Sequence, residues 1–359
     1  MKKLFTTLGL LCCLTGPASA ALKYAIINTG TSFTVPSDFS SLSAIDAIGA
    51  GSSNDAFRAG GGGGGFATQP TASLSVGNSL SLQVGIANGT NGLLSTVTIS
   101  NASPAVITWT QTFAANQPVF FTNSGGGLPT GITALQLYYV ISTGLSGSSF
   151  EISATVGGAA INTSSAGSGT QSGHSIGTAD SFVAQSNVVL VYAPGAIPPT
   201  GHTSGGVGGQ AANAIPTTGA YSGGTGGIGG TSSGNTGGSA GAAGPNGAGV
   251  NGVAFTGSRN GGAGDAGFGG AGGTTGSHNG VGGMEWTAST IAGCGNCLAG
   301  GTSAGSGGGT FGATVSSSGG AYGGGSNANG TPAGGVIVFI YNASVVGASP
   351  FIFIPAVIP

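Results

Sequence analysis

The stretch that decides the fold of this chain reads Gly223-Gly224-Thr225-Gly226-Gly227-Ile228-Gly229-Gly230, and its glycine-rich character extends from Gly201 to Gly335. This region holds 50 of the 79 glycines in the 359-residue chain. Glycine loses more backbone freedom on folding than any other residue, so such a region is costly to order. Two outcomes are open: a flexible linker, or an array in which backbones without Cβ atoms pack side by side.

An ordered array has a specific physical form. Extended left-handed helices with three residues per turn make no internal hydrogen bonds, so their N–H and C=O groups are free to bond to neighbouring helices. Strict Gly-X-Y periodicity is absent, which argues against collagen. Large side chains interrupt the tract, unlike the monotonous polar filler of a linker. We therefore expect a polyglycine-II-like packed region at 201–335.

Charged residues are scarce, at 3% of the chain against about 25% in ordinary soluble domains. Beyond the first 20 residues the basic residues are only Lys23, Arg58 and Arg259, against seven acidic residues. Binding to nucleic-acid phosphates needs clustered Lys and Arg, so no nucleic-acid partner is expected. The composition suits a surface or fibre protein that hydroxyls, amides and exposed backbone keep in solution.

Residues 1–20 have the pattern of a secretion signal. Lys2 and Lys3 precede an apolar run at 4–14, and Ala18-Ser19-Ala20 forms a small-residue cleavage site. We expect cleavage after Ala20. A lipoprotein signal would use Cys12 or Cys13, but the small residue that should precede such a cysteine is missing.

Cleavage leaves two cysteines, Cys294 and Cys297, separated by Gly295 and Asn296. In an exported protein they are expected to form a structural disulfide or to remain a free pair. Zinc would need two further ligands, and redox catalysis would need a following helix that the flanking glycines forbid. No metal and no cofactor is expected.

Short alternating apolar segments separated by turns predict an all-β fold, with no substantial helix outside the signal peptide. The strands predicted outside the middle of the chain are 22–28, 32–36, 41–48, a hairpin of 72–76 with 79–86, a strand pair or one long strand at 181–193, and a closing strand at 334–341.

Several of these segments resemble a known family when taken in order. They are Thr31-Ser32-Phe33-Thr34-Val35-Pro36, a strand near Ile45–Ile48, the run Gly60 to Gly65 with Phe66, Ser73-Leu74-Ser75-Val76-Gly77, Leu82-Gln83-Val84-Gly85, and Gly334-Gly335-Val336-Ile337-Val338-Phe339-Ile340-Tyr341. Together they look like the glycine-rich domain of bacteriophage tail-fibre and adhesin proteins. The resemblance implies a virion protein with a packed glycine region and a hydrophobic closing strand.

A second resemblance covers about 70 residues between these parts. A small β module of phage and prophage virion proteins is similar to the segments Asn101 to Thr110, Ala114 to Phe121, Leu128 to Thr133, Tyr138 to Ile141, Phe150 to Thr155 and Gly157 to Thr163. Physically this region predicts four or five strands around a small core of Trp109, Phe121, Tyr139 and Phe150.

These patterns divide the chain into a signal peptide (1–20), the first part of a glycine-rich β domain (21–96), an inserted β module (97–175), the continued glycine-rich domain (176–341) and an apolar tail (342–359). The prolines of the tail exclude a central strand or a helix. Two roles stay open for the tail: cover for the sheet of its own chain, or contact with another copy or partner.

Recognition by loops is the chemistry that the tract favours, because aromatic side chains give contact area at low entropic cost. The alternative is that the rings fill gaps inside the array. Trp286 stands at the least glycine-rich spot, as a loop tip would, so its replacement by Ala is expected to weaken attachment and spare stability. The candidate binding residues are Tyr221, Phe255, Phe268, Glu285, Trp286, Phe311 and Tyr322.

No catalytic motif appears. The acidic residues form no pair in sequence. A nucleophile elbow needs a serine between a strand and a helix, and no such helix is expected. No glycine motif follows a strand and opens a helix. We expect a non-enzymatic adhesive protein of the tail-fibre type that binds a cell-surface glycan or envelope protein, with other fibre subunits or its own copies as further partners. Its location would be the virion tail or the extracellular surface. A secreted bacterial surface or matrix protein with phage-derived modules is the alternative, favoured by the signal peptide, and a hydrolase acting on surface polysaccharide is a third.

Overall fold

The computed structural model describes residues 21–53, 59–231, 236–256, 260–273, 286–287, 303–304, 319–326 and 330–344. The predicted all-β class is confirmed: the strands are antiparallel, and the only helices in these ranges are the 3₁₀ turns η1 (Ala211–Asn213) and η2 (Asp265–Gly267). Neither has the length and apolarity needed to cross a membrane. The predicted signal peptide, Cys294, Cys297 and most of the predicted tail lie outside the described residues.

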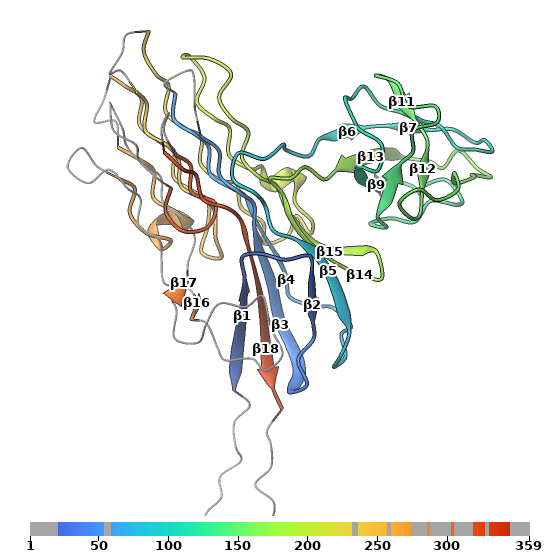
Figure 1. Ribbon diagram of the computed structural model, residues 1–359, viewed down its shortest axis with the longest axis horizontal. Helices are drawn as coiled ribbons and strands as arrows, with labels where there is room; N and C mark the ends of the chain where they lie inside the picture. Colours follow the sequence, from blue (N-terminus) through green and yellow to red (C-terminus); the bar gives the residue numbers. More distant parts are fainter. Residues whose placement is uncertain are drawn as a thin grey trace, which may run out of the picture.

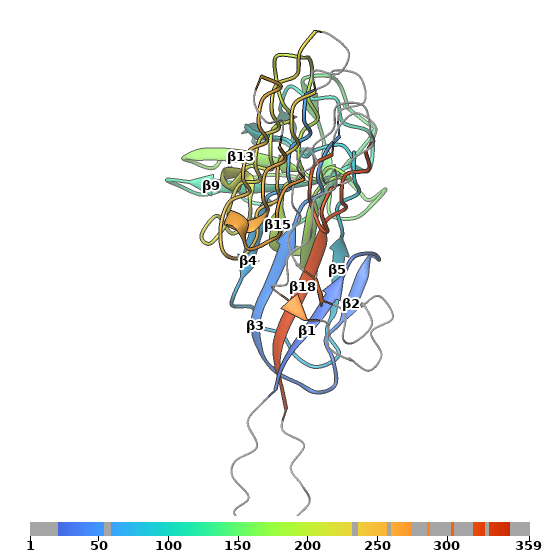
Figure 2. The same ribbon diagram turned by 90° about the vertical axis from the view of Figure 1, so that its left-hand side faces the viewer.

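Two four-stranded sheets form the centre of the molecule (Figure 1). The first has the order β1 (Leu22–Ile27), β18 (Val336–Ala343), β3 (Phe39–Ile48), β4 (Phe66–Gln69). The second has the order β15 (Val188–Ala193), β14 (Ser181–Gln185), β5 (Ser79–Gln83), β2 (Ser32–Thr34). Apolar side chains of both sheets share one core, in which the rings of Phe33 and Phe339 lie 4.9 Å apart. Because β18 pairs with β1, the two ends of the described chain lie side by side (Figure 2).

Most strands of these two sheets were predictable. The segments 22–28, 32–36, 41–48 and 334–341 correspond to β1, β2, β3 and β18. The segment 181–193 is a hairpin of β14 and β15, turned by Ser186 and Asn187 with φ of 49° and 64°, as in a two-residue hairpin turn. The predicted hairpin of 72–76 with 79–86 is wrong. Residues 72–76 form no strand, because β2 and β14 already occupy both edges of β5.

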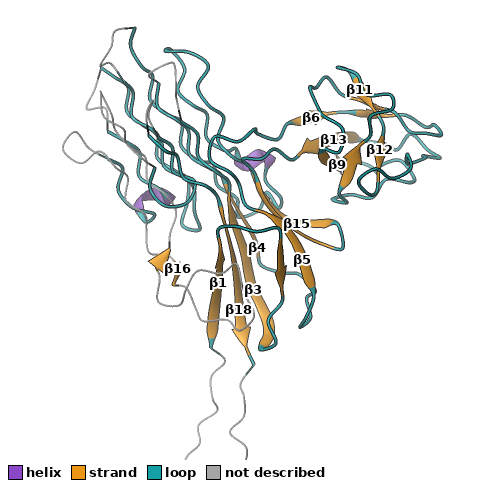
Figure 3. Ribbon diagram, in the orientation of Figure 1, coloured by secondary structure: helices purple, strands orange, loops and turns teal. Residues whose placement is uncertain are grey.

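The glycine-rich segments extend from the sheets as an array of side-by-side extended backbones (Figure 1), which are neither helix nor strand (Figure 3). The hexaglycine run 60–65 lies inside this array. Gly60 and Gly63 donate to Gly227 and Gly224, and Gly61 and Gly64 donate to Ser326 and Gly323. Residues three apart in the run thus donate to the same neighbouring segment. This three-residue repeat is the one that polyglycine-II-like packing requires.

The carbonyl groups of the same run follow the same repeat. They accept hydrogen bonds from the N–H groups of Gly206 and Gly209, of Ala240 and Ala243, and of Ser52 and Gly49. The two remaining N–H groups, of Gly62 and Gly65, bind Ser52 Oγ and the Pro194 carbonyl. Every N–H and C=O group of residues 60–65 is therefore bonded, although the run belongs to no sheet.

Only glycine fits at the centre of this array. A Cβ atom built on each of Gly60, Gly61, Gly63 and Gly64 would lie within 3.0 Å of a neighbouring backbone carbonyl. The missing side chains let the backbones approach closely enough for bonds of 2.8 to 3.1 Å. These bonds contribute about 1 kcal/mol each, so their number offsets the entropy that glycine loses on folding.

The middle of the chain forms a separate β module, which projects sideways from the sheets (Figure 1). Eight short strands make it up, rather than the four or five predicted: β6 (Leu94–Thr96), β7 (Thr98–Ile99), β8 (Ile107–Thr108), β9 (Pro118–Ser124), β10 (Tyr138–Val140), β11 (Ser149–Phe150), β12 (Ile152–Ser153) and β13 (Thr170–Ser175). They pair in the orders β12-β10-β9-β13-β6 and β11-β8-β7. The first strand begins three residues before the predicted boundary at 97.

Trp109, Phe121 and Phe150 lie in the core of the module as predicted. Tyr138, and not the predicted Tyr139, fills the fourth aromatic position. Successive side chains of a strand point to opposite faces, so the prediction is off by one residue. Tyr139 instead lines a groove between the module and the sheets.

A buried carboxylate joins the module to the sheets. Asp180 accepts hydrogen bonds from the N–H groups of Gly92 and Gly177, where the chain enters and leaves the module, at 2.9 and 2.7 Å. It also accepts from Gly195 N–H and from Tyr192 Oη, both at 2.8 Å. The Asp180 side chain therefore holds both of the connections between the sheets and the module.

Candidate functional site

The predicted binding residues fall into different places in the structure. Tyr221 extends the first sheet by pairing with Phe66, and its ring stacks on the Phe66 ring with centroids 6.3 Å apart. Phe255 is half-buried, and its N–H donates to the Ile228 carbonyl at 3.0 Å. Glu285 and Phe311 lie outside the described residues. These positions do not form one site.

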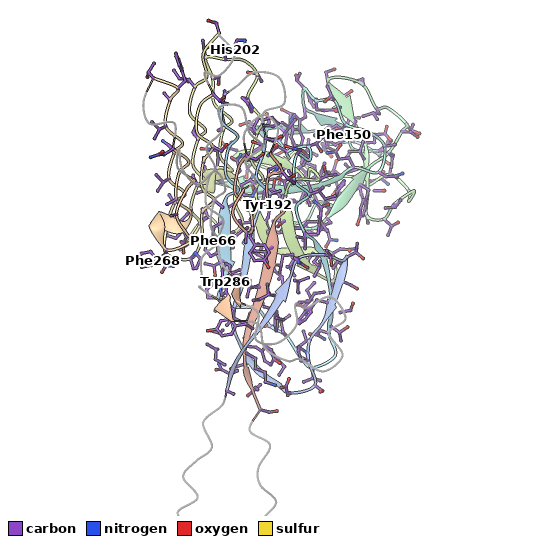
Figure 4. All side chains as sticks on the ribbon, turned by 60° about the vertical axis from the view of Figure 1, so that its left-hand side comes forward. Phe66, Phe150, Tyr192, His202, Phe268 and Trp286 are labelled. Carbon is purple, nitrogen blue, oxygen red and sulfur yellow. The ribbon has the colours of Figure 1, made fainter. Side chains whose placement is uncertain are left out.

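Two of the predicted residues do come together. Phe268 and Trp286 line the same groove, on one side of the molecule (Figure 4). The groove has a volume of about 570 Å³ and lies over the outer face of the first sheet. Its lining residues are Leu22, Tyr24, Ser43, Asp46, Pro245, Asn246, Phe268, Trp286 and Ile340. We call this the lateral groove.

The expectation that Trp286 stands exposed at a loop tip is wrong. β16 (Trp286–Thr287) pairs with β17 (Ser303–Ala304), and the Trp286 side chain is only 3% exposed. It packs on the outward face of the first sheet with Ile26, Val338 and Ile340. The outer face of this sheet is apolar and must be covered, so the ring serves as core as well as groove wall. Tyr322 is partly buried against the same cluster.

Phe268 has the opposite character. Its side chain is 69% exposed, the largest fraction among the exposed large apolar residues of the described chain. It follows a turn in which Asp265, Ala266 and Gly267 have φ of 47°, 54° and 103°. Two consecutive non-glycine residues in the left-handed region store backbone strain, and such strain gathers at ligand clamps and active sites.

The Asp265 carboxylate holds this turn in place. It accepts hydrogen bonds from the N–H groups of Asn246 and Gly247 at 2.6 and 2.8 Å, and from the Asn246 amide at 2.6 Å. Gly244 makes room for it, because a Cβ there would lie within 3.0 Å of the carboxylate. The turn that presents Phe268 is therefore rigidly anchored to the array.

Asp46 forms the polar floor of the lateral groove. It lies on the outward face of β3, is 5% exposed, and accepts hydrogen bonds from the side chains of Thr68 and Trp286. Burial raises its pKa to about 6, its two hydrogen bonds oppose that shift, and the nearby Asp265 charge adds to it. The described residues include no cluster of His, Cys, Asp or Glu that would hold a metal ion.

No protein-family model matches the chain, and no curated protein or solved structure does so either. The resemblance to tail-fibre glycine-rich domains therefore stays a hypothesis, carried by the motifs of the sequence. The geometry of the lateral groove stands independently of it.

Three important groove residues were not foreseen from the sequence. Tyr24 and Asp46 belong to strands whose other face fills the main core, and Asn246 belongs to a turn between glycine segments. The alternation of β1 and β3 does place Tyr24 and Asp46 on the face away from the core. No sequence signal indicates that the segments 245–246 and 265–268 fold over that face.

The lateral groove combines a projecting ring, a buried carboxylate and a fixed amide. Such a combination suits reversible recognition, because the aromatic ring gives contact area and the polar groups give direction. Asp265 is fully buried and accepts three hydrogen bonds from Asn246 and Gly247, so it is poorly placed to act on a substrate.

Proposed function

We propose that this protein is a non-enzymatic structural and adhesive protein of the phage tail-fibre type, which attaches to a host surface. The observation that carries the proposal is the bonding of the hexaglycine run 60–65 on all sides by chain segments from distant parts of the sequence. Such an array is a rigid support for recognition loops. The lateral groove, with Phe268 on its anchored turn, is the contact site that we assign to it.

A second candidate is a secreted bacterial surface or matrix protein that uses the same modules. The pattern of residues 1–20 favours it, because a virion protein that assembles in the cytoplasm does not need a secretion signal. The groove and the array would serve attachment in either case.

Two measurements test the proposal. Labelled mature protein is expected to adsorb saturably to cells of a susceptible bacterium, and Phe268→Ala is expected to reduce that adsorption. Absence of saturable adsorption would overturn the attachment role. A protein inventory of purified phage particles and of the cell envelope then separates the two candidates: presence in particles supports the first, presence only in the envelope supports the second.

A further inference from the structure

The lateral groove is acidic and aromatic and contains no basic side chain among its lining residues. Lys23 is the only Lys or Arg among the described residues, and it pairs with Asp38. Lys23 alternates along β1 with the groove residues Leu22 and Tyr24, so it belongs to the opposite face of the strand. No described basic residue therefore offsets the negative charge of the groove.

Two carboxylates contribute that charge. Asp46 lies in the floor, and Asp265 lies close enough behind it to act on it electrostatically. Both are buried, where charge interactions are screened less than in water. An anionic ligand would be repelled here, whereas a cationic group would be attracted.

Three aromatic side chains complete the groove. Tyr24 is half-buried, Trp286 stands against the floor, and Phe268 projects into solvent. The faces of aromatic rings attract organic cations, and pockets of this type recognise quaternary ammonium groups in particular. The exposed Phe268 ring, on its anchored turn, offers apolar area that a bound ligand would remove from water.

We propose that the lateral groove binds an organic ammonium group of a cell-envelope component, a group that choline headgroups and amino sugars share. This inference rests on the proposed attachment role, because it names the chemistry of the ligand at the same site. The ammonium group lies between the Phe268 ring and the Asp46 carboxylate, and Asn246 bonds the polar remainder of the ligand.

The test compares choline with 3,3-dimethylbutan-1-ol, an uncharged molecule of nearly the same shape, by titration calorimetry on the mature protein. Choline is expected to bind at least about fivefold more tightly than the alcohol. Phe268→Ala is expected to weaken choline binding by a similar factor, and Phe268→Tyr to retain it. Ile228→Ala, an exposed apolar residue outside the groove, serves as the control and leaves binding unchanged.

A pH series adds a second readout, because the charge of choline does not change with pH. The groups that face the Asp46 carboxylate are Thr68, Trp286 and Asp265, and Tyr24 lines the same groove. Protonation of Asp46 removes the floor charge, so choline binding is expected to weaken between pH 7.5 and pH 5. Asp46→Asn is expected to remove this pH dependence.

To test an amino sugar as the source of the ammonium group, charged glucosamine is compared with uncharged glucose. Tighter binding of choline than of glucosamine assigns a headgroup, and the reverse assigns an amino sugar. Equal binding of charged and uncharged partners in both pairs, or no binding of either cation, overturns the inference. If cells still adsorb the protein in that case, the attachment role stands with another ligand. If the cations bind but cells do not adsorb the protein, the ligand inference stands and the proposed attachment role is wrong.

Discussion

Gly64 donates its backbone N–H to the carbonyl oxygen of Gly323 at 2.8 Å, although the two residues lie near opposite ends of the chain. A Cβ atom on Gly64 would lie within 3.0 Å of the Gly49 carbonyl, so its neighbours would have to move apart. Gly64→Ala is therefore expected to lower the free energy of unfolding by about 1–3 kcal/mol, the usual cost of overpacking. Urea denaturation measures this change.

Gly201→Ala is the matched control, because nothing lies within 4 Å of a Cβ at this position and its φ is not in the left-handed region. Its effect on unfolding is expected to stay within about 0.5 kcal/mol. Equal losses for the two substitutions would show that close backbone packing does not stabilise the array.

Amide hydrogen exchange tests the array directly. The N–H groups of residues 60–65 are buried and bonded, so their exchange is expected to require opening of the whole array. Gly125 and Gly157 lie in exposed turns of the module and serve as fast-exchanging references. Rapid exchange throughout 60–65 and the described parts of 201–335 would contradict a rigid support.

The strands of the two central sheets were predictable because alternation of apolar and polar residues records which face is buried. The sequence predicted that the glycine segments pack into an ordered array, but not which segments lie side by side. Its bonds join backbone atoms, and glycines carry no side-chain pattern, so nothing in the sequence places 60–65 against 224–227 or 323–326. The groove depends on those backbone pairings. Phe268 was therefore identifiable as a candidate, whereas the burial of Trp286 was not.

Asp180 is expected to be among the most important polar residues for stability. Asp180→Asn removes the charge that four donors share and turns an N–H₂ group toward some of them. Each buried donor left without a partner costs about 1–3 kcal/mol, so a loss of at least about 3 kcal/mol is expected in urea denaturation. Asp38→Asn, at a partly exposed ion pair with Lys23, is expected to cost about 1 kcal/mol. Similar losses for both would argue against the junction role.

Burial of His174 is expected to make the folded protein less stable as the pH falls. Its ring stacks on Phe120 with centroids 4.5 Å apart, and burial lowers its pKa to about 4. The unfolded chain takes up a proton near pH 6.5 and the folded protein does not, so stability is lost as pH falls from 6.5 to 4. The loss amounts to about 3 kcal/mol at most.

Asp46 and Asp180 act in the opposite direction, because burial raises the pKa of each to about 6. They favour the folded state as pH falls from 6 toward 3.8, so the total stability of the protein does not isolate His174. The comparison with His174→Phe does, because both proteins share the two aspartates. The variant is expected to lose less stability between pH 6.5 and pH 4, and parallel curves would rule out this assignment.

Trp286→Ala separates the core role of this ring from a role in binding alone. The side chain is buried with Ile26, Val338 and Ile340, and it donates a hydrogen bond to Asp46. Its removal leaves a cavity and takes away one of the two side-chain hydrogen bonds of the Asp46 carboxylate, so the free energy of unfolding is expected to fall by about 3–5 kcal/mol. Phe268→Ala, on the same groove but exposed, is expected to change it by less than about 0.5 kcal/mol. If Trp286→Ala unfolds at the same temperature or urea concentration as the wild type, the ring does not stabilise the core. That result would favour the exposed loop-tip position that its sequence neighbours suggest.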